Sequence, residues 1–152
     1  MPIPRSAIGT ELPPVTVDIE PGRLRFFAKA IGETDPVYLD QAAAKAAGHP
    51  DLPVPPTFLF GLELEQADPF AYLTALGADL RHVLHGEQTF TYHSVAHAGD
   101  RLTVRPRIVD VYTKKGGALE FLVKESAVTR ANGSAVADLT SVIIVRAPGE
   151  RA

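Results

Sequence analysis

The sequence predicts an α+β domain in which a curved antiparallel sheet wraps around one long central helix. Three observations support this fold class. The prolines are concentrated in the first half of the chain, and only Pro106 and Pro148 follow residue 70. From Leu80 onward, apolar residues recur with a period of two, which is typical of strands. Between these regions lies a helical stretch with apolar residues on every side, which indicates a helix enclosed by the rest of the fold.

The first half of the chain is expected to hold a short strand and two helices. Residues 15 to 19 alternate as a strand. Pro21 suits the first position of a helix, because the N–H that it lacks would be unsatisfied there. Gly32 stands where the C-terminal cap of that helix would be. A second helix is expected at residues 41 to 47, with Asp40 as its N-cap.

The central helix is expected at residues 57 to 65, directly after Pro55 and Pro56. The two prolines preset the direction in which the chain enters the helix, and they have no N–H of their own. The first free backbone N–H groups of this helix are therefore expected near Thr57 and Phe58.

The second half of the chain predicts an antiparallel meander. Asn132-Gly133 is a strong two-residue hairpin signal, because both residue types tolerate positive φ. A shift of apolar parity near Ile108 predicts a β-bulge, and Pro106 beside it argues for an edge or bulged position. The arrangement outlines a hot-dog fold, whose unpaired edge strand a dimer would cover. The expected strands lie at about 80 to 97, 101 to 113, 118 to 131 and 134 to 146.

Length and composition indicate one globular domain over residues 1–152, with its core at about 15–146. The chain has 45% hydrophobic and 22% charged residues, which is an ordinary globular composition. Its formal charge is −3, from 15 basic and 18 acidic residues, so no basic patch for nucleic acid is expected. There is no cysteine, which excludes thiolate chemistry and favours a cytoplasmic location. We expect neither a membrane span nor a secretory leader.

Several stretches of the chain resemble one enzyme family. The segment from Phe27 to Tyr38 reads FAKAIGETDPVY and resembles the signature of MaoC-like (R)-specific enoyl hydratases and 3-hydroxyacyl dehydratases. Residues 53–58 look like the start of that family's central helix, and residues 84–102 look like its following strand and turn. The resemblance is closest to the N-terminal FAS1-type dehydratase domain, which includes the catalytically silent subunit of heterodimeric mycobacterial-type dehydratases.

The resemblance implies a set of catalytic positions, and the departure from the family at Tyr38 is the most serious. The family pattern is Gly-Asp-x-Asn-Pro-aliphatic-His, in which the Asp and the His hold the water that adds to the enoyl double bond. Here Glu33 stands at the Asp position, Asp35 at the Asn position and Tyr38 at the His position. An unperturbed tyrosine has a pKa near ~10 and would need a large downward shift to act as a base.

The resemblance also implies a binding site at the start of the central helix. In the family, a backbone N–H there binds the thioester carbonyl, and Thr57, between Pro56 and Phe58, takes that position. Because a backbone donor does not depend on its side chain, Thr57 in place of the usual glycine need not remove it. The implied substrate is an acyl-CoA or acyl-ACP thioester, and no cofactor is expected.

Two further groups of residues are candidate catalytic sites. His85 and Glu87 flank Gly86 and could form a catalytic pair, although a bulge at Gly86 with local backbone contacts is the commoner reading. Glu33 and Asp35 could form a carboxylate pair, although a turn or cap role is commoner.

No metal site is expected in this chain. His93 and His97 would lie on one face of an extended strand, roughly 13 Å apart at about 3.3 Å per residue, which is too far for one ion. The other histidines that lie close in sequence, His82 and His85, would point to opposite faces.

The leading hypothesis is an acyl-thioester-binding hydro-lyase of the (R)-specific hydratase and dehydratase type. Because Tyr38 replaces the motif histidine, the chain could act as the substrate-binding partner of a catalytic hot-dog subunit. Two alternatives stay open. One is a hot-dog acyl-CoA thioesterase that uses Glu33, Asp35 or Glu87 to activate water, and the other is a non-catalytic acyl-binding module. A homodimer, or a heterodimer with another hot-dog subunit, is expected.

Overall fold

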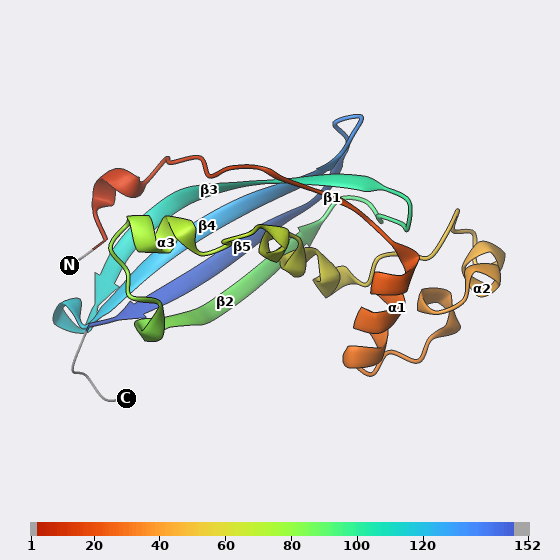
Figure 1. The fold of residues 1–152 in the computed structure, drawn as a ribbon, viewed down its shortest axis with the longest axis horizontal. Helices are drawn as coiled ribbons and strands as arrows, with labels where there is room; N and C mark the ends of the chain where they lie inside the picture. The colour runs from red at the N-terminus through yellow and green to blue at the C-terminus, as the bar shows by residue number, and fades with distance from the viewer. Residues whose placement is uncertain (1–2, 148–152) are drawn as a thin grey trace.

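The computed structural model describes residues 3–147 and contains a five-stranded antiparallel sheet. Figure 1 shows its long strands curving side by side, with a helical segment crossing one face. The sheet order is β1-β3-β4-β5-β2, and every neighbouring pair is antiparallel. The predicted α+β class and curved sheet are therefore confirmed, whereas the predicted meander holds only for β3, β4 and β5, because β2 pairs with β5 and not with β3. The strands are β1 (Val15–Asp18), β2 (Val83–Tyr92), β3 (Arg101–Lys114), β4 (Leu119–Arg130) and β5 (Ala135–Arg146).

The two helices predicted in the first half of the chain are present. One begins at Pro21 and is followed by Gly32 at φ +73°. The other follows Asp40, whose carboxylate accepts a hydrogen bond from the N–H of Ala42 at 2.8 Å. The α-helices are α1 (Pro21–Ala30), α2 (Gln41–Ala46) and α3 (Ala71–Ala75), and the 3-10 helices are η1 (Arg5–Ala7), η2 (Pro36–Tyr38), η3 (Pro56–Glu65), η4 (Leu80–His82) and η5 (Lys115–Gly117).

The central helix, η3, differs from the predicted long helix in type and in surroundings. It is a 3-10 helix of 10 residues. Leu59 and Leu62 are buried, whereas Phe60 and Leu64 are 36% and 46% exposed. The expectation of a helix enclosed on all sides is therefore wrong, because the apolar side chains of one side line an open cavity instead of the core.

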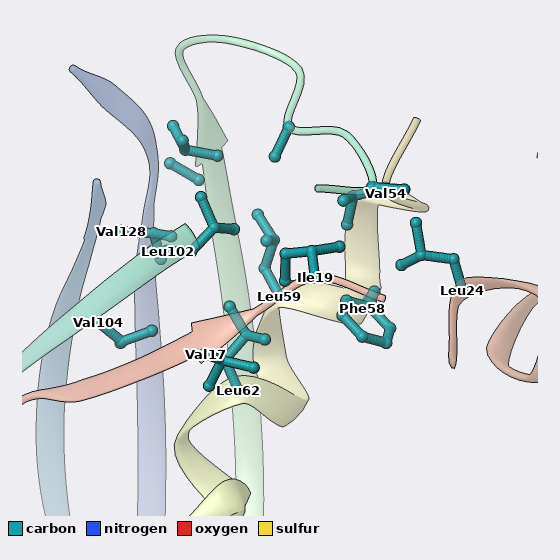
Figure 2. Packing of buried hydrophobic residues seen from close by; sticks show 14 of the residues in the cluster. Val17, Ile19, Leu24, Val54, Phe58, Leu59, Leu62, Leu102, Val104 and Val128 are labelled. Atoms are coloured by element: carbon teal, nitrogen blue, oxygen red, sulfur yellow. The ribbon is translucent and has the colours of Figure 1, made fainter. Parts of the chain in front are cut away.

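The buried side of η3 packs against the sheet. Figure 2 shows Leu59 and Leu62 beside Val17 of β1, with Val104 of β3 and Val128 of β4 to the left of them. All five side chains belong to one buried cluster. A second buried cluster joins α3 to the other end of β3, β4 and β5. The central helix is thus fixed along the concave face of the sheet.

Two irregularities of the sheet agree with the sequence. The pairing of β3 with β4 shifts between Ile108 and Asp110, which confirms the predicted bulge. The pairing of β2 with β5 shifts between His85 and Glu87, which confirms a bulge at Gly86. A Cβ atom on Gly86 would lie 2.6 Å from Cδ1 of Ile144, so only glycine fits there without a rearrangement.

At Pro106 the outer neighbour of β3 is no longer β1 but the segment that precedes β1, which bridges β3 between Glu11 and Arg107. The pairing of β1 with β3 ends at Val104, and the carbonyl of Pro106 accepts from the N–H of Leu12 at 2.9 Å. Because the N and C=O groups of one strand residue point to the same side, the proline nitrogen also faces away from β4. Pro106 therefore costs the β3–β4 ladder no hydrogen bond, although residues 9–12 cover this side of β3 and the position is not the free edge that was expected.

Two expected boundaries need correction. Strand β2 ends at Tyr92 instead of residue 97, so the separation expected for His93 and His97 on one strand does not apply. The hairpin between β4 and β5 is present, but four residues separate the strands and only Gly133 has positive φ, at +85°. Over residues 3–147 no helix is long and apolar enough to cross a membrane.

Candidate functional site

A cavity of about 410 Å³ lies between η3, α3 and the concave face of the sheet. Its lining is mostly apolar, and several of the apolar side chains are about half exposed, which places them at the mouth. A volume of this size is in the range of small-molecule sites. The half-exposed lining residues are Leu64, Phe70, Leu80 and Leu84.

The floor of this cavity is polar. We use "cavity floor" for Glu63, Lys124 and Ser141, which line the cavity and are 9%, 8% and 7% exposed. The ammonium group of Lys124 donates to one carboxylate oxygen of Glu63, and the hydroxyl of Ser126 donates to the other. The hydroxyl of Ser141 donates to the side-chain oxygen of Gln88 at 2.6 Å. A buried ion pair thus lies in the floor of a mostly apolar pocket.

Tyr72 completes the polar end of the cavity. Its ring centroid lies 5.1 Å from the ammonium nitrogen of Lys124, within range of a cation–π interaction. Burial, and secondarily the negative charge of Glu63, raise the pKa of the Tyr72 phenol above its usual range. The phenol is therefore neutral at physiological pH.

The first turn of η3 offers a free backbone donor. Phe58 donates its N–H to the carbonyl of Pro55 at 3.0 Å, so that group is already engaged. Within residues 3–147 the N–H of the exposed residue Thr57 has no hydrogen-bond partner. A smaller hollow of about 260 Å³, lined in part by Pro56 and Tyr92, lies beside this turn. Of the residues predicted to bind the thioester, Thr57 alone presents a free N–H.

The segment that carries the predicted catalytic motif lies at the same end of the molecule as Thr57. Phe27 of α1 packs edge to face on Phe58, with 5.4 Å between the ring centroids. The segment from residue 31 to residue 40, called here the α1–α2 connection, follows directly. Figure 1 shows α1 and α2 at the opposite end of the molecule from α3.

In the α1–α2 connection both candidate carboxylates are engaged by nearby backbone. Glu33 accepts from the N–H groups of Thr34 and Asp35, both at 2.9 Å. Asp35 accepts from the N–H of Val37 at 3.0 Å and so caps η2. Tyr38 ends η2 and is partly buried. These contacts are those of a capped turn.

The bulge at Gly86 separates the other candidate pair, His85 and Glu87. The ring of His85 packs edge to face on Phe60, with centroids 5.0 Å apart, and lines the large cavity. Gln88 also faces the cavity side, since it is bonded to Ser141. Because neighbouring strand residues alternate, Glu87 faces the other side of the sheet. His85 and Glu87 therefore do not face each other.

Sequence reasoning missed the three residues of the cavity floor. A signal for Lys124 was present, because in β4 it takes the inward parity of Leu122 and Val128, where an apolar residue is expected. Glu63 follows an apolar helical run together with Glu65, and this pattern is also that of a solvated helix end. The pairing of Glu63 with Lys124 requires the tertiary structure.

Other histidines of the chain make local contacts. Nδ1 of His49 lies 3.0 Å from Nε2 of His97, and Nε2 of His93 lies 2.7 Å from Asp138. Burial, and secondarily the charge of His49, lower the pKa of His97 below its usual value. Within residues 3–147 no group of three or more histidine or acidic side chains is placed to hold a metal ion.

A curved sheet around a central helix, with an apolar cavity along that helix, defines a protein of the hot-dog class. The chain belongs to the FAS1-like dehydratase domain region family, whose model matches residues 6–139. A UPF0336 protein of Saccharopolyspora erythraea is 38% identical over 152 residues, which covers 99% of this chain and 96% of that protein.

Solved structures show the same fold. The HadBC (3R-hydroxyacyl-ACP dehydratase) complex of Mycobacterium tuberculosis matches with a TM-score of 0.76 and 22% identity, over 91% of this chain and 96% of that chain. The ChsH1–ChsH2 complex of the same organism matches with a TM-score of 0.77 and 22% identity, over 97% and 89%. A MaoC-like dehydratase gives a TM-score of 0.82 at 18% identity, over 94% of this chain and 43% of that one. The fold is that of MaoC-like dehydratases.

Proposed function

We propose that this chain binds acyl thioesters as a subunit of an (R)-specific enoyl hydratase or 3-hydroxyacyl dehydratase. The observation that carries the proposal is the free N–H of Thr57 at the start of a helix that runs along an apolar cavity. The N–H would donate to the thioester carbonyl, and the cavity would take the acyl chain.

The 3-10 geometry of η3 supports a continuous path between these two features. In a 3-10 helix the side chains of residues i and i+3 lie above one another. Thr57, Phe60 and Glu63 therefore share one side of η3, and Phe60 and Glu63 line the cavity. An acyl chain held at Thr57 would pass Phe60 and continue toward Glu63.

The donor at Thr57 also suits the chemistry of hydration. When water adds to the β-carbon of an enoyl thioester, negative charge develops on the carbonyl oxygen before a proton reaches the α-carbon. A fixed backbone N–H directed at that oxygen stabilises the charge without needing to reorient. In the reverse direction it stabilises the same enolate while hydroxide leaves as water.

We further propose that the groups that transfer the protons come from a second hot-dog subunit. Tyr38 takes the place of the motif histidine, and Glu33 and Asp35 are engaged in a capped turn. The proposal has support in the HadBC and ChsH1–ChsH2 structures, which are complexes. Strand β2 lies at the edge of the sheet, where a second subunit could extend the ladder.

The thioester site is tested by a variant that lacks the backbone N–H of residue 57. Thr57→Pro deletes the backbone N–H at a position in the first helical turn, where proline is tolerated. Thr57→Ala keeps the N–H and serves as the matched control. We expect Thr57→Pro to weaken crotonyl-CoA binding about tenfold, as for a lost hydrogen bond, and Thr57→Ala to bind normally. Equal affinity in both variants would contradict the assignment of this donor.

The proposal that a second subunit supplies the catalytic groups is tested by an activity assay of the purified chain. We expect crotonyl-CoA binding without hydration by the chain alone, and hydration once a hot-dog subunit with a complete Asp…His motif is added. Robust hydration by the chain alone, lost in Tyr38→Phe or His85→Ala, would overturn the partner proposal. Release of free thiol would identify a thioesterase instead, and binding without either product in the presence of the partner would identify an acyl-binding module.

A further inference from the structure

We propose that the cavity floor recognises a hydroxyl group on the acyl chain, so that the preferred substrates are hydroxylated acyl thioesters. This inference rests on the proposed binding of acyl thioesters. The hydroxyl in question is not the one that hydration adds at the β-carbon. It lies further along the acyl chain, far from the carbons that react. Thr57 and Glu63 are six residues apart, which is about 12 Å along a 3-10 helix at about 2.0 Å per residue.

The polar residues at the floor form a row across three strands. Lys124 of β4 pairs directly with Ser141 of β5, and Ser141 pairs directly with Gln88 of β2. Directly paired side chains lie on the same face of the sheet, with Cβ atoms about 4.5–5.5 Å apart. Lys124 and Ser141 also line the same cavity, so a small group bound there has both residues as neighbours.

The hydrogen bonds at the floor leave N–H donors on Lys124 and lone pairs on the Ser141 hydroxyl without a hydrogen-bond partner in the described part of the chain. Lys124 carries three N–H donors, and its only hydrogen-bond partner in the described part of the chain is Glu63. Ser141 uses its hydrogen in the bond to Gln88, so the lone pairs of its oxygen are left to accept. A hydroxyl group accepts from Lys124 and donates to Ser141 at the same time.

Other chemical groups fit this floor less well. A ketone oxygen would accept from Lys124 but offers Ser141 no hydrogen. A methyl group would offer Lys124 no acceptor, so that its only partners among the described residues of an apolar pocket would be Glu63 and the ring of Tyr72. A carboxylate would place a second negative charge beside Glu63, whose charge already balances that of Lys124. The expected order of affinity is hydroxyl, then ketone, then plain alkyl.

A purely structural role does not account for the buried ion pair of Glu63 and Lys124. Burying two charges costs several kcal/mol each, and well-packed apolar residues in their place are often neutral or stabilising. The two side chains are only 10% and 12% exposed, at the bottom of a cavity with an apolar mouth. A site that holds purely apolar chains would gain from an apolar floor.

The test compares acyl-CoA ligands that differ in one oxygen atom. Calorimetry measures the binding of saturated acyl-CoAs, from octanoyl to hexadecanoyl, and of their terminally hydroxylated counterparts. We expect the hydroxylated ligand to bind about tenfold more tightly at the chain length that reaches the floor, as for a hydrogen bond to a charged group. Ketone analogues should fall between the two.

Three variants test whether the cavity floor causes the preference for hydroxylated ligands. Ser141→Ala removes the acceptor without changing any charge and should reduce the preference severalfold. Thr140→Ala, the adjacent residue on β5, faces the other side of the sheet and should leave it unchanged. The double variant Glu63→Leu with Lys124→Met should abolish the preference for hydroxylated ligands, and circular dichroism verifies that each variant is folded.

The outcomes separate this inference from the proposed function. If the native chain binds both ligand series equally, hydroxyl recognition is wrong while acyl-thioester binding stands. If neither series binds, both proposals fail. A preference that survives in Ser141→Ala and in the double variant would overturn the role given to the cavity floor.

Discussion

The α1–α2 connection and the cavity floor both carry ionisable side chains, but in opposite surroundings. In the connection, Glu33 and Asp35 accept hydrogen bonds from backbone N–H groups within two residues. At the cavity floor, Glu63 accepts from Lys124 and Ser126, which lie 61 and 63 residues away in the sequence. The local bonds to Glu33 and Asp35 shape a turn, whereas the long-range bonds to Glu63 join the central helix to the sheet. The motif segment is therefore recognisable from sequence, and the cavity floor is not.

The largest effect is expected from breaking the buried ion pair. Lys124→Met leaves the carboxylate of Glu63 buried without its cation, and such a loss typically costs about 3–5 kcal/mol. Urea denaturation measures the free energy of unfolding. The same method applied to Glu63→Leu with Lys124→Met should show a much smaller loss, because no uncompensated charge remains.

The double variant is also the control that gives this comparison its meaning. If Lys124→Met and the double variant destabilise the chain equally, the loss comes from packing and not from an unpaired charge. If Lys124→Met has no effect, Glu63 and Lys124 do not form a buried pair, and the contrast with the exposed connection disappears.

A smaller effect is expected from a single methyl group at the β2 bulge. In Gly86→Ala the new Cβ would lie 2.6 Å from Cδ1 of Ile144 and 3.2 Å from the carbonyl oxygen of Val142. Overpacking of this kind costs about 1–3 kcal/mol. Gly22→Ala in α1 is the matched control, since nothing lies within 4 Å of its Cβ, and it should stabilise the chain by up to about 1 kcal/mol. Thermal melting of both variants tests the prediction, and equal melting temperatures would contradict it.

Much of the fold was predictable because its determinants are local. Pro21 and Asp40 mark the starts of α1 and α2, and the bulges near Ile108 and at Gly86 follow from parity and from glycine. The surroundings of η3 were not predictable. Periodicity shows which residues are apolar, but it does not distinguish a side that packs on the sheet from a side that lines a cavity.

The only part of the candidate site that could be predicted from sequence is the one formed by a backbone group. Thr57 was found because two prolines precede it, and its free N–H depends on local geometry. Glu87 was grouped with His85 because a sequence does not show how a bulge turns alternate side chains. Lys124 and Ser141 meet through strand register, which links positions that no local motif connects.

The role of the α1–α2 connection is tested by comparing two aspartates that accept the same kind of capping hydrogen bond. Asp35 accepts from Val37 and Asp40 accepts from Ala42, each two residues further on. If Asp35 is only a cap, Asp35→Ala and Asp40→Ala should each cost about 0.5–2 kcal/mol and leave hydration by the complex with its partner unchanged. A loss of hydration in Asp35→Ala alone would show that the motif carboxylate takes part in the chemistry.

The smallest effect concerns His97, which joins the connection between β2 and β3 to the loop after α2 through its 3.0 Å contact with His49. Burial and the nearby His49 lower the pKa of His97 below 6.5, and the carboxylates of Asp51 and Asp100 act in the opposite direction. The unfolded chain therefore binds more protons than the folded chain in the window between the two pKa values, and stability must rise with pH there. The contribution of His97 is fully present above pH 6.5 and declines as the pH falls through that value, until it levels off below the pKa of the folded state. Urea denaturation between pH about 7.5 and about 5 should show a shallower decline for His97→Gln than for the native chain. Identical pH profiles would mean that the contact between the two imidazoles does not couple protonation to folding.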